Sequence, residues 1–190
     1  MTIPNQLTVL RLVLTLLFVA ALSVQFPGAK LLALALFACS SLTDLADGYI
    51  ARRFHQITDF GKLMDPLVDK IMTMAAFICL VSVGGIPAWA VIVILSREFM
   101  ITGLRLIAAS RGKVLPAERL GKLKTVWQII TILYYLLLVT VLEQFGRLIA
   151  SSIVTSLNVV GMALVLFTVG LTLWSGVAYF AKNRDLVSDM

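Results

Sequence analysis

Six apolar segments, each about long enough to cross a bilayer as a helix, occupy most of this 190-residue chain. Their approximate ranges are 7–24, 31–50, 60–83, 88–109, 125–142 and 153–180. Hydrophobic residues make up 60% of the sequence and charged residues 14%, whereas about 25% is typical of a soluble domain. We therefore expect an all-α integral membrane protein with six transmembrane helices, formed by one domain over residues 1–190.

The basic residues are concentrated in the loops on one side of these segments. That side carries Arg52, Arg53, Lys62, Arg111, Lys113, Arg119, Lys122, Lys124, Lys182 and Arg184. The other side has only Lys30 and Arg147. By the positive-inside rule both termini are cytoplasmic, and this rule accounts for the net charge of +6 without a nucleic-acid partner. The first segment has no cleavable-signal pattern, so we expect a multi-pass protein of the cell inner (plasma) membrane.

Four aspartates interrupt the second and third segments near the same membrane face. Asp44 and Asp47 are three residues apart and Asp65 and Asp69 are four apart, so each pair shares one helix face. A charged side chain near a bilayer centre costs about 3 kcal/mol, and converging carboxylates repel one another unless cations lie between them. Oxygen ligands without nearby His or Cys favour Mg²⁺ or Mn²⁺ over Zn²⁺. The sequence therefore predicts a metal site between two helices.

The full pattern is D-x-x-D-G-x-x-A-R-x8-G-x3-D-x3-D, running from Asp44 to Asp69. It resembles the signature of the CDP-alcohol phosphotransferase family, which are integral membrane enzymes of phospholipid synthesis. The segments PNQLTVLR, SREFMITGLR and LGKLKT look like the phosphatidylglycerophosphate synthase branch of that family. This resemblance implies transfer of a phosphatidyl group from CDP-diacylglycerol to sn-glycerol 3-phosphate. It also implies six helices around a polar, metal-containing cavity open to the cytoplasm, in a homodimer.

The resemblance also implies roles for individual residues. A pair of divalent ions would be bound by Asp44, Asp47, Asp65 and Asp69, and Asp69 would also be the general base. The CDP moiety would contact Gly48, Ala51, Arg52 and Gly61. Helix packing is the alternative for the small residues, and anchoring at the interface is the alternative for Arg52. Asn5, Thr8 and Arg11 share a face of the first helix, where they either line the nucleotide site or cap and anchor that helix.

An anionic acceptor needs a basic pocket. Arg97 and Arg105 lie in the fourth segment or at its cytoplasmic end, where an arginine needs a carboxylate, a phosphate or a water-filled cavity. We expect the acceptor phosphate to bind Arg105 with Arg111, Lys122 or Lys124, and Arg97 is a further candidate. An ordinary positive-inside loop is the alternative. Glu98 is adjacent to Arg97, but neighbouring side chains point about 100° apart on a helix, so we expect a poor ion pair.

Two further functions fit the aspartates. The same chemistry could use another acceptor: phosphatidylglycerol, as in a cardiolipin synthase, inositol phosphate or serine. A cation transporter is the alternative from another class, since intramembrane aspartates can form an ion path. The aspartates cluster near one face, however, and the last two segments contain none to continue such a path. Phosphatidyl transfer is therefore the main prediction.

Overall fold

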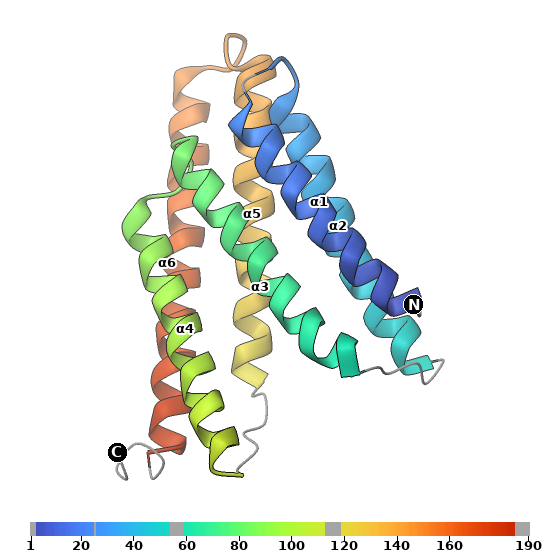
Figure 1. Cartoon of the computed structure of the whole chain (residues 1–190). Coiled ribbons are helices and arrows are strands. Elements are labelled where there is room, and N and C mark those ends of the chain that lie inside the picture. Colours follow the sequence, from blue (N-terminus) through green and yellow to red (C-terminus); the bar gives the residue numbers. More distant parts are fainter. Residues whose placement is uncertain (1–2, 25, 54–58, 113–118, 185–190) are drawn as a thin grey trace.

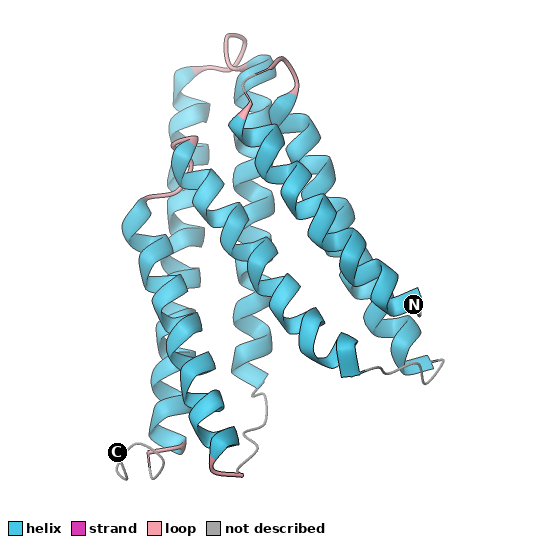
Figure 2. Ribbon diagram, viewed as in Figure 1, coloured by secondary structure: helices cyan, strands magenta, loops and turns pink. Residues whose placement is uncertain are grey.

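The computed structural model describes residues 3–24, 26–53, 59–112 and 119–184. Within these ranges, the side chains of residues 3, 4, 44–53, 59–63 and 119 lie outside the description. The described residues form helices and short turns, without a strand (Figure 2). The helices are α1 (Ile3–Ser23), α2 (Ala29–Arg53), α3 (Asp59–Ser82), α4 (Ala88–Ser110), α5 (Arg119–Phe145) and α6 (Ser151–Lys182).

Each helix overlaps one of the six apolar segments, and every helix extends beyond its segment at one end at least. The largest difference is at α5, which begins at Arg119, although LGKLK was expected to belong to a basic loop. Hydropathy marks only the part of a helix that suits hydrocarbon, whereas backbone hydrogen bonds continue through the polar interface. As a result, Lys122 and Lys124 lie on the first turns of α5, where their positions are fixed by the helix.

The helices run up and down, so the start of α1 and the end of α6 lie at the same end of the bundle (Figure 1). Helix α1 packs against α2 and α3, while α4 packs against α3 and α6. Helix α5 contacts α2, α3 and α6, so α3 and α5 link the two sides of the bundle. In the view of Figure 1, the α1–α2 pair and the α4–α6 pair diverge toward the end that carries the termini.

The apolar core lies toward the opposite end of the bundle. Its largest fully buried side chains come from α1, α2, α3 and α5: Phe18, Phe37, Phe77, Leu80, Ile132 and Leu136. Three basic side chains, Arg11 of α1, Arg97 of α4 and Lys124 of α5, are also buried. A smaller apolar cluster of Ile101, Leu104, Ala108 and Tyr179 joins the later parts of α4 and α6.

Large apolar side chains cover the outside of the bundle. Ile92, Leu106 and Trp174 are each more than 60% exposed, as expected for a surface that contacts lipid. Over the described residues, three helices are long and apolar enough to cross a membrane: Asn5–Ser23, Leu120–Phe145 and Ser151–Lys182. Helices α3 and α4 each contain several charged residues, and α2 has a shorter apolar part, Ala29–Thr43. Over the residues that the structure describes, the protein is all-α with six helices, and its apolar surface is that of a membrane protein.

Candidate functional site

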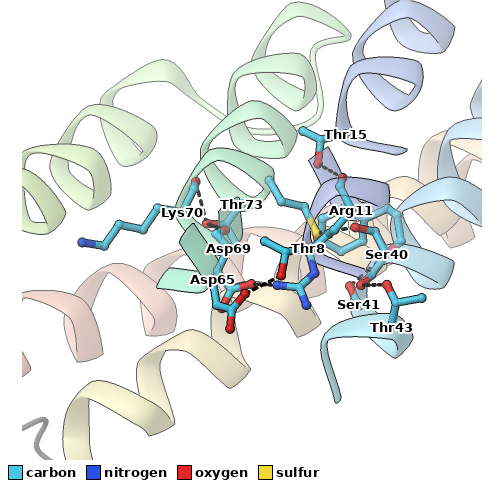
Figure 3. Close-up of polar contacts among 12 residues, drawn as sticks. Thr8, Arg11, Thr15, Ser40, Ser41, Thr43, Asp65, Asp69, Lys70 and Thr73 are labelled. Carbon is cyan, nitrogen blue, oxygen red and sulfur yellow. Dashed lines mark hydrogen bonds and ion pairs between the residues drawn. The ribbon is translucent and has the colours of Figure 1, made fainter. Parts of the chain in front are cut away.

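Asp65 and Asp69 lie one turn apart on α3, and neither carboxylate is fully buried. Figure 3 shows them on the same side of the helix, facing α1. This arrangement follows from their spacing of four residues, which brings side chains to one face of an α-helix. The pairing expected within the third segment is therefore present.

Helix α1 supplies a polar partner to each carboxylate. The Thr8 hydroxyl donates a hydrogen bond to Asp65 Oδ1 at 2.5 Å, and Arg11 Nη1 donates to Asp69 Oδ1 at 2.5 Å (Figure 3). The Arg11 side chain is fully buried, whereas 44% of the Asp69 side chain is exposed. A guanidinium group away from water requires such a charged partner, and in return it stabilises the Asp69 carboxylate.

The other two aspartates are on α2, which approaches α3 just before them. Ser40 Oγ donates to Met72 Sδ at 2.9 Å, linking these two helices about one turn before Asp44. The side chains of Asp44 and Asp47 lie outside the described residues, as do those of Ala51 and Arg52 and the surroundings of Gly48 and Gly61. The residues expected to contact CDP from α2 and the start of α3 thus remain predictions.

The described donors suit a hard divalent cation. Asp65 and Asp69 present carboxylate oxygens, and Thr8 adds a hydroxyl, without nitrogen or sulfur ligands beside them. Mg²⁺ and Mn²⁺ prefer such oxygen ligands. Among the described residues, no three His, Cys, Asp or Glu side chains gather closely enough to hold a metal ion. A complete site would need carboxylates from α2 as well.

A cavity of about 280 Å³ lies beside Asp69, between α3, α4, α5 and α6, and Ser41 of α2 also lines it. The other polar and charged side chains that line it come from these four helices. They are Asp69, Lys70 and Thr73 of α3, Arg97, Glu98, Thr102 and Arg105 of α4, Lys122, Lys124, Thr125 and Gln128 of α5, and Ser175 and Tyr179 of α6. Four of the five basic residues expected to bind the acceptor phosphate therefore line one cavity.

Glu98 is the carboxylate that α4 contributes to this cavity. It forms an ion pair with Lys124 of α5, and its Oε1 lies 3.7 Å from Arg97 Nη1. The contact with Arg97 is long, as expected for adjacent residues on a helix, and the closer partner of Glu98 is Lys124. Both side chains are long enough to bend toward the cavity, although their Cα–Cβ bonds diverge. Arg97 Nη2 also donates to Ser175 Oγ at 3.2 Å, which connects α4 to α6.

Arg105 is held at the cavity by α6. Its Nε donates to the Tyr179 hydroxyl at 3.1 Å, and its guanidinium carbon lies 5.5 Å from the centre of the Tyr179 ring. Lys122 is exposed where it lines the cavity. Arg111 is exposed immediately after α4 and does not line the cavity. Its contact with the acceptor remains a prediction from the sequence alone.

Asn5 and Thr8, the nucleotide contacts expected on α1, are both buried. Sequence reasoning missed the pairing of Arg11 with Asp69 and the cavity position of Lys70. Charge alone was a signal for both, because each is a charged residue within a largely apolar segment. Their partners come from other helices, however, and helical periodicity relates only residues on the same helix. The pairing of Glu98 with Lys124 was missed for the same reason.

Comparison with known proteins adds an independent observation. Residues 1–174 match the family model described as CDP-alcohol phosphatidyltransferase. A Bacillus subtilis protein named CDP-diacylglycerol--glycerol-3-phosphate 3-phosphatidyltransferase is 44% identical over 142 residues, which cover 68% of this chain and 74% of that protein. A Rickettsia bellii protein of the same name is 32% identical over 178 residues, covering 94% of this chain and 93% of its own length.

Proposed function

The chain belongs to the CDP-alcohol phosphatidyltransferase family, and on that premise we propose that it transfers a phosphatidyl group from CDP-diacylglycerol to sn-glycerol 3-phosphate. The products are phosphatidylglycerophosphate and CMP. The observation that carries this proposal is the position of Asp69 beside a cavity lined by lysines and arginines. Such a cavity suits an acceptor that brings both a reactive hydroxyl and a phosphate.

The metal site in this proposal consists of Asp44 and Asp47 of α2 with Asp65 and Asp69 of α3. Their oxygen donors fit a pair of Mg²⁺ or Mn²⁺ ions. When bound, these ions offset the negative charge that develops on the phosphate oxygens and on the leaving group. Thr8 supports the site through its hydrogen bond to Asp65, which restricts the orientation of that carboxylate.

The reaction needs a base because the acceptor hydroxyl is hardly ionised at neutral pH. Asp69 accepts the proton of the acceptor hydroxyl. The hydroxyl oxygen attacks the phosphorus atom that carries the diacylglycerol. The bond between that phosphorus and the oxygen that bridges it to CMP breaks, and CMP leaves with the electron pair. Arg11 positions Asp69 for this step through the 2.5 Å contact between Nη1 and Oδ1.

The two substrates occupy different parts of the site in this proposal. The CDP group lies against α1, α2 and the start of α3, where the proposed contacts are Asn5, Thr8, Gly48, Ala51, Arg52 and Gly61. The acceptor phosphate lies in the cavity with Arg97, Arg105, Lys122 and Lys124. This division leaves Asp69 between the nucleotide side and the acceptor side, as the attack requires.

The proposed setting is the inner (plasma) membrane, with six spans and both termini in the cytoplasm. The start of α1 and the end of α6 share one end of the bundle, which supports an even number of crossings (Figure 1). The metal site and the cavity lie toward that end and would open to the cytoplasm, where glycerol 3-phosphate is dissolved. Residues 1–190 would form one domain, and two copies would associate as a homodimer.

An acceptor panel tests this function. Purified protein receives CDP-diacylglycerol with glycerol 3-phosphate, phosphatidylglycerol, inositol phosphate or serine, and the lipid product is identified by mass spectrometry. We expect phosphatidylglycerophosphate from glycerol 3-phosphate and little product from the other acceptors. Product formed only from another acceptor would overturn the assignment of the substrate. Cation flux in liposomes without product from any acceptor would favour the transporter instead.

A further inference from the structure

Lys70 is a cavity cation that the proposed reaction has not used. It follows Asp69 on α3, but its side chain extends away from the Asp65 and Asp69 carboxylates (Figure 3). Its ammonium group donates a hydrogen bond to Thr102 Oγ1 of α4 at 2.5 Å. The side chain therefore reaches from the helix of the proposed base to the opposite wall of the cavity.

The basic side chains of the cavity differ in how far their charge is offset. Glu98 forms an ion pair with Lys124 and lies 3.7 Å from Arg97 Nη1. Within the described part of the chain, Lys70, Arg105 and Lys122 have no carboxylate at ion-pair distance. Lys70 is half-buried, whereas Arg105 and Lys122 are exposed. A half-buried cation without a counterion is costly in a membrane protein, and an anionic ligand removes this cost. Lys70 thus marks the part of the cavity where an anion is most strongly favoured, and Arg105 and Lys122 line the same cavity.

Thr102 fixes the orientation of the Lys70 ammonium group. The Thr102 hydroxyl donates to the backbone oxygen of Glu98 at 2.8 Å, so its lone pairs are free to accept from Lys70. An ammonium group has three N–H donors, and Thr102 accepts one of them. The other two remain for a ligand in the cavity, which Lys70 lines together with Arg105.

We propose that Lys70 binds the phosphate of the acceptor and thereby sets its distance from Asp69. This inference rests on the proposed function. In glycerol 3-phosphate, a three-carbon chain separates the attacking hydroxyl from the phosphate. Asp69 and Lys70 line the same cavity, so a molecule in it whose hydroxyl meets Asp69 can extend its phosphate toward Lys70. Lys70 from α3 and Arg105 from α4 contact this phosphate from two walls of the cavity, which selects acceptors that carry a phosphate.

The test compares Lys70→Gln, Lys70→Arg and a matched control, Lys30→Gln. Lys30, at the start of α2, pairs at 3.6 Å with Glu143, near the end of α5, and neither residue lines the cavity. Loss of a charged hydrogen bond to phosphate should raise the KM for glycerol 3-phosphate about 10-fold or more in Lys70→Gln. The KM for CDP-diacylglycerol should stay near the wild-type value. Lys70→Arg should recover most of the loss, and Lys30→Gln should have no effect.

Calorimetric titration of glycerol 3-phosphate into each purified protein separates this inference from the proposed function. One outcome is that Lys70→Gln binds glycerol 3-phosphate more weakly than the wild type, while the wild type does not turn this compound over. That outcome would support the phosphate site and overturn the proposed reaction. Unchanged binding and KM in Lys70→Gln would overturn the inference alone, as would a raised KM for CDP-diacylglycerol only. If Lys70→Gln does not fold, Thr102→Val tests the same contact, with an expected rise in acceptor KM of about 3-fold.

Discussion

Arg11 of α1 and Asp69 of α3 form an ion pair in which Nη1 lies 2.5 Å from Oδ1. The arginine is fully buried in the bundle, whereas the aspartate is 44% exposed and lines the cavity. A buried guanidinium group cannot move away from its partner without a large loss of free energy. We infer that Arg11 holds the proposed base in one orientation before either substrate binds.

Arg11→Gln should therefore lower both stability and activity. Losing a hydrogen bond to a charged group costs about 2 kcal/mol, and a misplaced base can reduce kcat about 100-fold. Thermal unfolding in detergent and CMP release measure the two effects, with Arg147→Gln at an exposed site as the control. The double variant Arg11→Gln/Asp69→Asn should regain much of the lost Tm while staying inactive. A stable, fully active Arg11→Gln would contradict the positioning role.

Thr8→Val should weaken metal binding, because it removes the hydrogen bond from the hydroxyl to Asp65. Losing a partner of a metal ligand typically costs 10-fold or more in affinity, so the Mn²⁺ dissociation constant should rise about 10-fold. Electron paramagnetic resonance of Mn²⁺ measures this constant directly. Thr8→Ser should retain the affinity of the wild type.

Thr15→Val is a matched control for Thr8→Val. Thr15 lies two turns further along α1, and its hydroxyl donates to the backbone oxygen of Arg11 at 2.8 Å. It is as buried as Thr8, but its hydrogen bond stays within its own helix. Equal losses of Mn²⁺ affinity in the two valine variants would indicate a general effect on α1 and would contradict a specific role for Thr8.

The sequence was sufficient to predict the six helices, because each one needs an apolar segment of bilayer length. It also predicted that Asp65 and Asp69 share a face, since their spacing matches the helical repeat. Helix ends were less predictable. Arg119 to Lys124 are too polar to be recognised as part of a span, yet the backbone there is helical because the interface tolerates charged side chains.

Contacts between helices were the part of the site that the sequence did not specify. Arg11 with Asp69 and Glu98 with Lys124 join residues far apart in the chain, and only the packing of α1 on α3 and the convergence of α4 and α5 on the cavity brings them together. Lys70 follows the last aspartate of the motif, and its sequence position does not indicate which helix its long side chain reaches. Its reach to Thr102 depends on the crossing of α3 and α4.

The proposed topology predicts opposite labelling at two loops. In a background with Cys39 and Cys79 replaced by alanine, Arg147→Cys should react with a membrane-impermeant maleimide in intact cells. Arg184→Cys should react only after the membrane is opened, because six crossings leave the end of α6 in the cytoplasm. Labelling of Arg184→Cys in intact cells would contradict the orientation and would place the cavity on the other side.

The central claim is metal-dependent phosphatidyl transfer with Asp69 as the base. Release of CMP from CDP-diacylglycerol tests it most directly, with purified wild type and Asp69→Asn compared and glycerol 3-phosphate as the acceptor. The wild type should release CMP with Mg²⁺ or Mn²⁺, lose this activity in EDTA, and regain it when the ion is restored. Asp69→Asn should be slower by about 10³-fold, since a general base contributes at that level. Glu143→Gln, an exposed carboxylate away from the cavity, should match the wild type. Metal-independent release, or near-normal release by Asp69→Asn, would contradict the account.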